Sequence, residues 1–209
     1  MLSYKRNLLT AIVSGWVLLS ACAYASAQGV VTQDAAQFIA NHEPELGGAN
    51  QARKFYLISN LAPAALAANQ VDKARSYAEQ LLAMGQAMQS QPGFGPSFYG
   101  NGTHVGNVVL GQIAYLNGDI KAAKEHLLEA GKVPGSPNLN SFGPDMRLAK
   151  ELIAKGERET VLQYLDLCAT FWKNDRGRLE TWKQNIKQGE EPNFGSNVGY
   201  VFDIWRFAK

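Results

Sequence analysis

The feature that most constrains the fold is a pattern that occurs three times along the chain. Residues 60–85, 109–132 and 147–172 each contain an apolar run, a short turn element and a second apolar run with helical spacing. A Leu marks the same position in each segment: Leu61, Leu110 and Leu148. The turn comes eight residues later, at Asn69, Gly118 and Gly156. Because Asn and Gly tolerate the left-handed conformation that ends many helices, the pattern predicts three helix-turn-helix units and an all-α fold.

The second segment carries the most specific set of marks. They are Leu110, Gly111, Gly118, Asp119, Ala123, Leu127 and Ala130. In these positions it resembles the tetratricopeptide repeat (TPR), a unit of 34 residues. The resemblance covers about half of the mature chain. It implies a right-handed array of antiparallel helix pairs, a TPR-like superhelix with about three divergent repeats, over residues 32–209.

The spacing of the units departs from that family. Leu110 follows Leu61 by 49 residues, and Leu148 follows Leu110 by 38. The additional residues lie in two Gly- and Pro-rich stretches, 89–104 and 132–145, which we expect to be long loops on the same side of the array. Within the first, residues 100–106 superficially resemble a phosphate loop, although a flexible loop that enters a helix is the simpler prediction. Pro63 predicts a kink or a restart in the first helix of the first unit.

Further helices are expected at both ends of the array. Apolar residues between Thr32 and His42 predict a short helix before the first unit. Leu179, Trp182 and Ile186 have the spacing of one helical face, and Gly189 follows them, which predicts a C-terminal capping helix. The aromatic tail at residues 199–209 would be an aggregation hazard in water, so we expect it to pack back on the array, with a partner surface as the alternative.

The N-terminus has the composition of an export signal. Lys5 and Arg6 precede an apolar run over residues 8–19, which is too short to span a bilayer. Residues 19–22 resemble the bacterial lipobox, which implies cleavage after residue 21 and a lipid on Cys22. Residues 25–27 also allow ordinary cleavage after Ala27. The lipobox predicts a signal peptide at 1–21, a tether at 22–31 and an outer-membrane lipoprotein that faces the periplasm. The alternative cleavage predicts a soluble periplasmic or secreted protein.

Charge and cysteine content exclude several classes of function. The chain carries 20 Lys and Arg and 18 Asp and Glu, so removal of Lys5 and Arg6 leaves equal numbers of each sign. A neutral surface without basic runs argues against nucleic-acid binding and against polybasic membrane binding. The membrane contact would therefore be the lipid on Cys22. Cys168 then has no disulfide partner, and it is expected to be a buried thiol between helices.

The sequence contains no recognisable catalytic, metal-binding or cofactor-binding motif. The alternative of an envelope enzyme, acting on a small molecule or a cell-wall fragment, would need the two loops to bring His104, Ser141 and Asp145 together. His126 is predicted to lie on the surface. We expect no metal and no cofactor.

The array itself suggests a function in binding. In TPR arrays the first helix of each pair lines the concave face, which suits peptides and protein segments. The aligned register places these residues there: Tyr56, Ser59, Asn60, Gln112, Tyr115, Arg147 and Lys150. Among them, Arg147 suits a bidentate contact with a partner's carboxylate. The sequence thus predicts a non-enzymatic module that binds or scaffolds a protein or peptide, with a structural lipoprotein subunit of a membrane complex as a further alternative.

Overall fold

A computed structural model describes residues 32–91 and 95–199 of the chain. Residues 32–42 are helical, and a 3-10 turn, η1 (Glu43–Gly47), follows them. Six helices form the repeats: α2 (Gln51–Ala67), α3 (Val71–Met88), α4 (Pro96–Leu116), α5 (Ile120–Gly131), α7 (Arg147–Ala154) and α8 (Arg158–Cys168). The remaining elements are α6 (Pro137–Phe142), α9 (Arg178–Lys187) and η2 (Gly195–Val198). The described part of the chain contains no strand, which confirms the all-α fold class.

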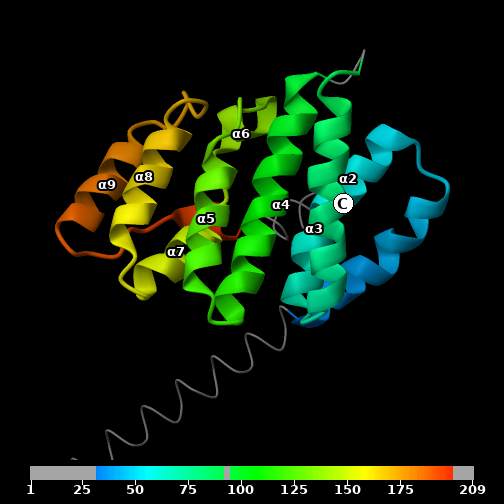
Figure 1. The fold of residues 1–209 in the computed structure, drawn as a ribbon, viewed down its shortest axis with the longest axis horizontal. Helices are drawn as coiled ribbons and strands as arrows, with labels where there is room; N and C mark the ends of the chain where they lie inside the picture. The colour runs from blue at the N-terminus through cyan, green and yellow to red at the C-terminus, as the bar shows by residue number, and fades with distance from the viewer. Residues whose placement is uncertain (1–31, 92–94, 200–209) are drawn as a thin grey trace, which may run out of the picture.

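Each predicted unit is a pair of neighbouring helices. The pairs are α2 with α3, α4 with α5, and α7 with α8 (Figure 1). Asn69, Gly118 and Gly156 occupy the turns with φ of 58°, 79° and 85°. The residue after each turn position donates its amide to a carbonyl five residues back: Gln70 to Ala65, Asp119 to Ala114 and Glu157 to Leu152. This is the bond that closes a helix before a left-handed residue, so the predicted turn chemistry is confirmed in all three units.

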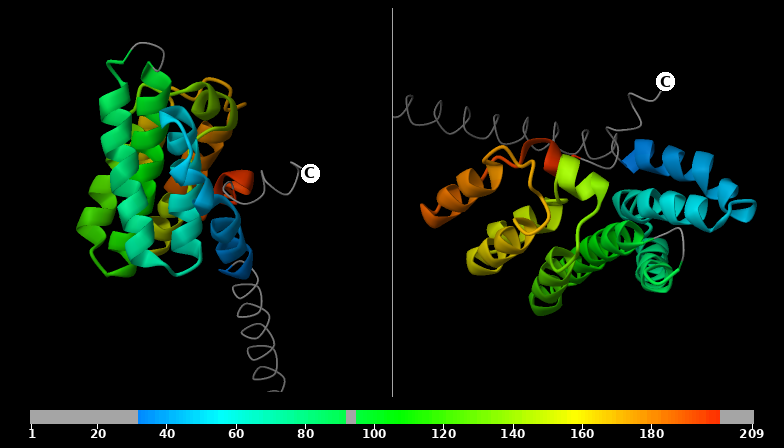
Figure 2. Two further views of the ribbon diagram at one scale, coloured as in Figure 1. Left: turned by 90° about the vertical axis from the view of Figure 1, so that its right-hand side faces the viewer. Right: turned by 90° about the horizontal axis from the view of Figure 1, so that it is seen from above.

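The pairs stack into an arc. The first helices contact one another in the order α2, α4, α7, and α5 joins the second unit to the third through α7 and α8. Seen from above, the helices follow a curve and η2 lies on its inner side (Figure 2). Two hydrophobic clusters fill the arc, and α4 contributes to both of them.

Glycines of α4 allow a close approach between units. A Cβ on Gly111 would lie 2.3 Å from Cδ2 of Leu148 and 3.0 Å from Cβ of His126. Ala123, predicted to lie where the two helices of the second unit touch, is fully buried. The small residues of the pattern therefore lie at helix contacts, as their spacing predicted.

The prediction of a long loop over residues 89–104 is wrong. Helix α4 begins at Pro96, so most of this stretch is helical. Residues 100–106, which superficially resemble a phosphate loop, also lie within α4. Glycine costs about 1 kcal/mol relative to Ala inside a helix. Here the absent side chains allow contact: a Cβ on Gly100 would lie 2.2 Å from the Gly135 carbonyl, and one on Gly102 would lie 2.9 Å from the Leu81 carbonyl. Packing thus overrides the local preference for a loop.

Two other expectations about chain breaks need correction. The second stretch, 132–145, contains α6, whose first turn is capped by Ser136 through a hydrogen bond from the Leu139 amide (3.0 Å). Helix α2 does not restart at Pro63 but continues to Ala67. Because Pro63 has no N–H, the Ser59 carbonyl lacks its helical partner, and Pro63 is buried within the continuous helix.

The terminal predictions agree with the structure where it describes them. The helix at 32–42 is present, and α9 buries Leu179, Trp182 and Ile186 before Gly189 turns with φ of 85°. Cys168 is a buried free thiol. The signal peptide, Cys22, the tether and nearly all of the aromatic tail lie outside the described residues. Among the residues that are described, no helix is both long and apolar enough to cross a membrane.

Candidate functional site

The candidate site is the inner side of the arc, where α4 contacts α7 and α7 contacts a returning segment of the chain. Residues 190–199 follow α9 and end at η2, which contacts α7. Asn197 is buried there, and its Nδ2 donates to the carbonyls of Phe142 (3.0 Å) and Pro144 (2.9 Å). The Met146 amide in turn donates to the Asn197 carbonyl (2.9 Å). The connection from α6 to α7 thus holds the 3-10 turn η2 of the same chain through main-chain and carboxamide hydrogen bonds.

Arg147 is paired with a carboxylate from the same chain. Its Nε lies 3.0 and 2.9 Å from the two carboxylate oxygens of Asp145, and its amide donates to Oδ1 (3.0 Å). The two side chains are only 18% and 11% exposed. Burial would raise the pKa of Asp145, but the charge and hydrogen bonds of Arg147 outweigh it and hold that pKa below its ordinary value. A partner carboxylate would therefore have to compete with Asp145 for this guanidinium.

His104 and Asp145 do come together, but in a structural arrangement. The Asp145 amide donates to His104 Nε2 (3.0 Å), so the ring proton is on Nδ1, which donates to the Ala130 carbonyl (2.9 Å). Burial lowers the pKa of His104 below its ordinary value, which keeps the ring neutral. Both ring nitrogens are occupied, so neither can take a proton from a substrate. Ser141 is exposed on α6.

A second polar contact crosses from α4 to α7. Gln112 Nε2 donates to Glu151 Oε1 (2.9 Å), whereas Gln112 Oε1 and Glu151 Oε2 are buried without a hydrogen-bond partner. Burial raises the pKa of Glu151 above its ordinary value, although the Gln112 hydrogen bond and the charge of Arg147 oppose the shift. Gln112, predicted to face a ligand, is thus buried between two helices.

The other predicted binding residues keep some exposure. Tyr56 on α2 is 44% exposed, and Arg53 lies over its ring at 5.6 Å. Asn60 donates to the Tyr56 carbonyl (2.7 Å). Tyr115 on α4 is half-buried, with Lys155 Nζ 5.8 Å from its ring centre.

Lys150 lies beside the returning segment. Its Nζ is 3.8 Å from Glu191, and its side chain is 54% exposed. The structure therefore groups His104, Gln112, Asp145 and Arg147 near the contact of α4 with α7 and leaves Tyr56 and Asn60 on α2.

His126 is not the surface residue that the sequence suggested. It is half-buried on α5, and its Nδ1 contacts Asn107 Oδ1 on α4 at 2.9 Å. Burial lowers its pKa below the ordinary value. The sequence predicted the position of this second helix correctly, but it did not predict which face of the helix is exposed. Glu125 is exposed, whereas His126 is half-buried.

Sequence reasoning missed Glu151 and Asn197. Glu151 sits one position after Lys150 on a short helix and has no feature that distinguishes it from a solvated charge. Asn197 lies in a Gly-rich stretch without periodicity. No group of three potential metal ligands occurs among the residues that the structure describes.

Comparisons with protein-family models, with curated proteins and with solved structures find no match for this chain. The geometry of the site therefore carries the functional argument by itself.

Proposed function

We propose that this chain is a non-enzymatic, TPR-like module that binds a protein or peptide segment on the inner side of its arc. The observation that carries the proposal is the returning segment at residues 190–199. The main chain between α6 and α7 binds Asn197 through its main-chain carbonyl and its carboxamide, and hydrogen bonds of these two kinds can also hold a segment of a partner chain.

The partner would lie along the first helices α2 and α4. Tyr56 and Tyr115 present aromatic rings on these first helices, and aromatic residues are enriched in protein interfaces. Lys150 adds an exposed cation beside Glu191. Together they suit a partner with apolar side chains and a carboxylate.

The proposed location is the bacterial cell envelope, with the lipid on Cys22 as the anchor. The support for it is the lipobox-like sequence at residues 19–22. A tether at residues 22–31 would leave the array free to meet partners in the periplasm.

Site-specific photocrosslinking in cells tests the binding face. Benzoylphenylalanine replaces Tyr56 or Tyr115 in separate variants, an aromatic exchange that preserves the ring contacts. The control position is Lys121 on the second helix α5, where the side chain is 88% exposed.

We expect both Tyr variants to form the same covalent adduct with one protein, and the Lys121 variant to form none. The proposal fails if Lys121 gives the same adduct in equal yield, or if neither Tyr position gives an adduct.

A further inference from the structure

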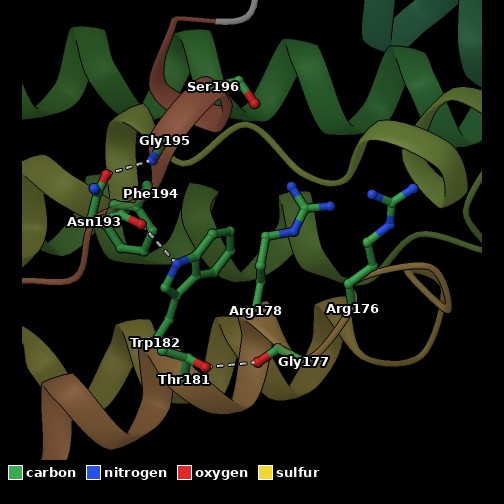
Figure 3. A pocket seen from close by; sticks show the side chains of 9 residues that line it. All are labelled: Arg176, Gly177, Arg178, Thr181, Trp182, Asn193, Phe194, Gly195 and Ser196. Atoms are coloured by element: carbon green, nitrogen blue, oxygen red, sulfur yellow. Dashed lines mark hydrogen bonds between the residues drawn. The ribbon is translucent and has the colours of Figure 1, made fainter.

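An open pocket lies at the C-terminal end of the array. It is about 410 Å³ in volume and lies between the start of α9 and the returning segment (Figure 3). Its lining includes Arg176, Arg178, Thr181, Trp182, Phe194 and Ser196. This volume is within the range of roughly 300–1,000 Å³ that is typical of small-molecule sites.

Two guanidinium groups border the pocket without an acidic partner. Among the described residues, no carboxylate oxygen lies within 4.0 Å of the side-chain nitrogens of Arg176 or Arg178. Figure 3 shows both side chains extending to the same side of the chain. By contrast, Arg53 and Arg147 are each paired with a carboxylate. Within the described part of the chain, Arg75 and Arg158 also have no ion pair, so what distinguishes Arg176 and Arg178 is that both unpaired charges border one pocket.

Arg178 is held in place by contacts that leave its outer nitrogens available. Its guanidinium carbon is 4.4 Å from the ring centre of Trp172, and its Nε donates to the Asp175 carbonyl (2.8 Å). The ring and the carbonyl fix the plane of the guanidinium. The two terminal nitrogens have no hydrogen-bond partner among the residues that the structure describes. A planar guanidinium fixed in this way is prepared for a bidentate oxyanion contact.

Arg176 adopts a backbone conformation that disfavours its residue type. Its φ is 56°, and the next residue, Gly177, has φ of 80°. A residue with a Cβ is strained in this region. Glycine or asparagine would relieve this strain, yet the chain carries an arginine here, and the turn places that arginine at the pocket beside Arg178.

The start of α9 does not supply the attraction. Asp175 Oδ2 accepts the Leu179 amide (3.0 Å), so the helix end already has a carboxylate cap. The positive character of the pocket comes from the two side chains.

The floor of the pocket is apolar. The rings of Trp182 and Phe194 meet edge to face, with their centres 5.0 Å apart. The indole N–H of Trp182 donates to the Asn193 carbonyl (3.0 Å), so it presents no free donor to a ligand. The Ser196 hydroxyl lies at the rim opposite the arginines (Figure 3).

We propose that this pocket binds a small ligand that carries a carboxylate or a phosphate group next to a planar apolar body. The guanidiniums of Arg176 and Arg178 bind the oxyanion, and the apolar body covers the small exposed edges of Trp182 and Phe194, which are each 3% exposed. This site is separate from the inner face of α2 and α4, and it does not depend on the function proposed there.

Calorimetric titration of the full chain with four probes tests the proposal. Phenyl phosphate and benzoate combine an oxyanion with a planar ring, benzamide keeps the ring without the charge, and inorganic phosphate keeps the charge without the ring. We expect saturable binding of phenyl phosphate or benzoate, with benzamide and inorganic phosphate at least tenfold weaker. The ratio of the two ring anions identifies phosphate or carboxylate as the preferred group. The absence of saturable binding by both ring anions overturns the proposal.

Three variants locate the site. Arg176→Asn keeps a residue that tolerates the left-handed turn, and Arg178→Gln removes the second charge; each should weaken binding of the better probe at least tenfold. Lys187→Ala removes an equal charge at the other end of α9 and should leave binding unchanged. Thermal melts confirm that each variant is folded, and Arg178→Lys, which keeps the charge and loses the planar fork, replaces Arg178→Gln if that variant does not fold. Unchanged binding in both arginine variants, or equal weakening by Lys187→Ala, overturns the proposal.

Discussion

Asp145 connects three elements through three different groups. Its amide donates to His104 on α4, its carbonyl accepts the Tyr164 hydroxyl from α8 (3.1 Å), and its carboxylate binds Arg147 at the start of α7. A single residue thus fixes the position of the second unit relative to the third. The same residue, considered on sequence grounds as part of an enzyme site, has its polar groups committed to the fold.

Asp145→Asn should therefore destabilise the protein strongly. The substitution removes the charge that compensates the largely buried guanidinium of Arg147, and we expect a loss of about 3 kcal/mol, the lower end for a broken buried ion pair. The matched control is Asp166→Asn, which breaks the pair with Lys183 at a carboxylate that is 68% exposed. That change should cost less than about 1 kcal/mol. Urea unfolding of both variants measures the difference, and equal costs would contradict the assigned role of Asp145.

Glu151 gives the fold a dependence on pH with a defined sign. Its pKa is raised on folding, chiefly by burial, so the folded state favours the protonated side chain. The stability from this group is complete below the unfolded pKa, about 4.5, and is lost as the pH rises through the folded pKa.

Glu151→Gln should therefore stabilise the protein at pH 7, and the gain should shrink as the pH falls toward 4.5. We expect the gain to be a fraction of the roughly 1–3 kcal/mol that a buried unsatisfied polar group costs. Urea unfolding at pH 7 and pH 5 measures it. Glu129→Gln, at an exposed pair with Lys132, is the control and should show little change at either pH. A variant that is less stable than the wild type at pH 7 would show that Glu151 is charged and favourable in the fold.

At the scale of the elements, the turns were predictable and the long insertions were not. Asn69, Gly118 and Gly156 could be assigned because a left-handed residue after a helix is a local requirement of the backbone. The stretch around Gly100 and Gly102 could not, because its helical state depends on contacts with residues that are distant in sequence. Local chemistry therefore predicted where the helices of the pairs end, and tertiary packing decided where α4 begins.

In the candidate site, too, the sequence predicted the helix on which a residue lies, whereas tertiary packing determined its contacts. Register placed Gln112 and Arg147 on the first helices correctly. It could not show that each side chain has a partner, since Glu151 lies 39 residues from Gln112 in the sequence. The returning segment that contacts α7 also had no periodic pattern to reveal it. The hydrogen-bond and ion-pair partners of polar side chains depend on how the helices pack together, so the sequence of one helix does not reveal them.

Alanine substitutions at two helical glycines, Gly100 and Gly85, distinguish the effect of tertiary packing on stability from the effect of helix propensity. Gly100→Ala should destabilise the protein by about 1–3 kcal/mol, because its Cβ would lie 2.2 Å from a backbone oxygen that belongs to Gly135. Gly85→Ala in α3 adds the same methyl group with its nearest contact at an ordinary 3.5 Å, from Tyr99 Cα. This control should stabilise the protein by about 0.5–1 kcal/mol. Thermal melts distinguish the two, and a rise in the melting temperature of Gly100→Ala would show that α4 does not approach Gly135 as described.

At the scale of the whole molecule, the C-terminal segment closes one end of a repeat stack. Arrays of helix pairs leave an apolar face at their last unit, and a terminal helix covers it. Here α9 covers α8, and the chain then returns so that Phe194 packs on Trp182 and Asn197 reaches the start of α7. The cap therefore ties the end of the array to its inner side, and the pocket with Arg176 and Arg178 is formed where the two parts meet.

The attachment of this array to a membrane is the remaining prediction at that scale. The sequence at residues 19–22 predicts a lipid on Cys22, whereas residues 25–27 predict cleavage after Ala27 and a free protein. Without residues 1–21 the chain has equal numbers of basic and acidic side chains, so its net charge gives no attraction to anionic lipids. We expect the wild-type protein to incorporate labelled palmitate and to sediment with membranes, and Cys22→Ser to lose both properties. Cys168→Ser is the control, because a buried thiol is not a substrate for lipid transfer and its loss should leave the label unchanged. Mass spectrometry of the wild-type N-terminus decides between the two cleavage sites: a mature chain that begins at Gln28 would contradict the lipid anchor and make the array a soluble binder.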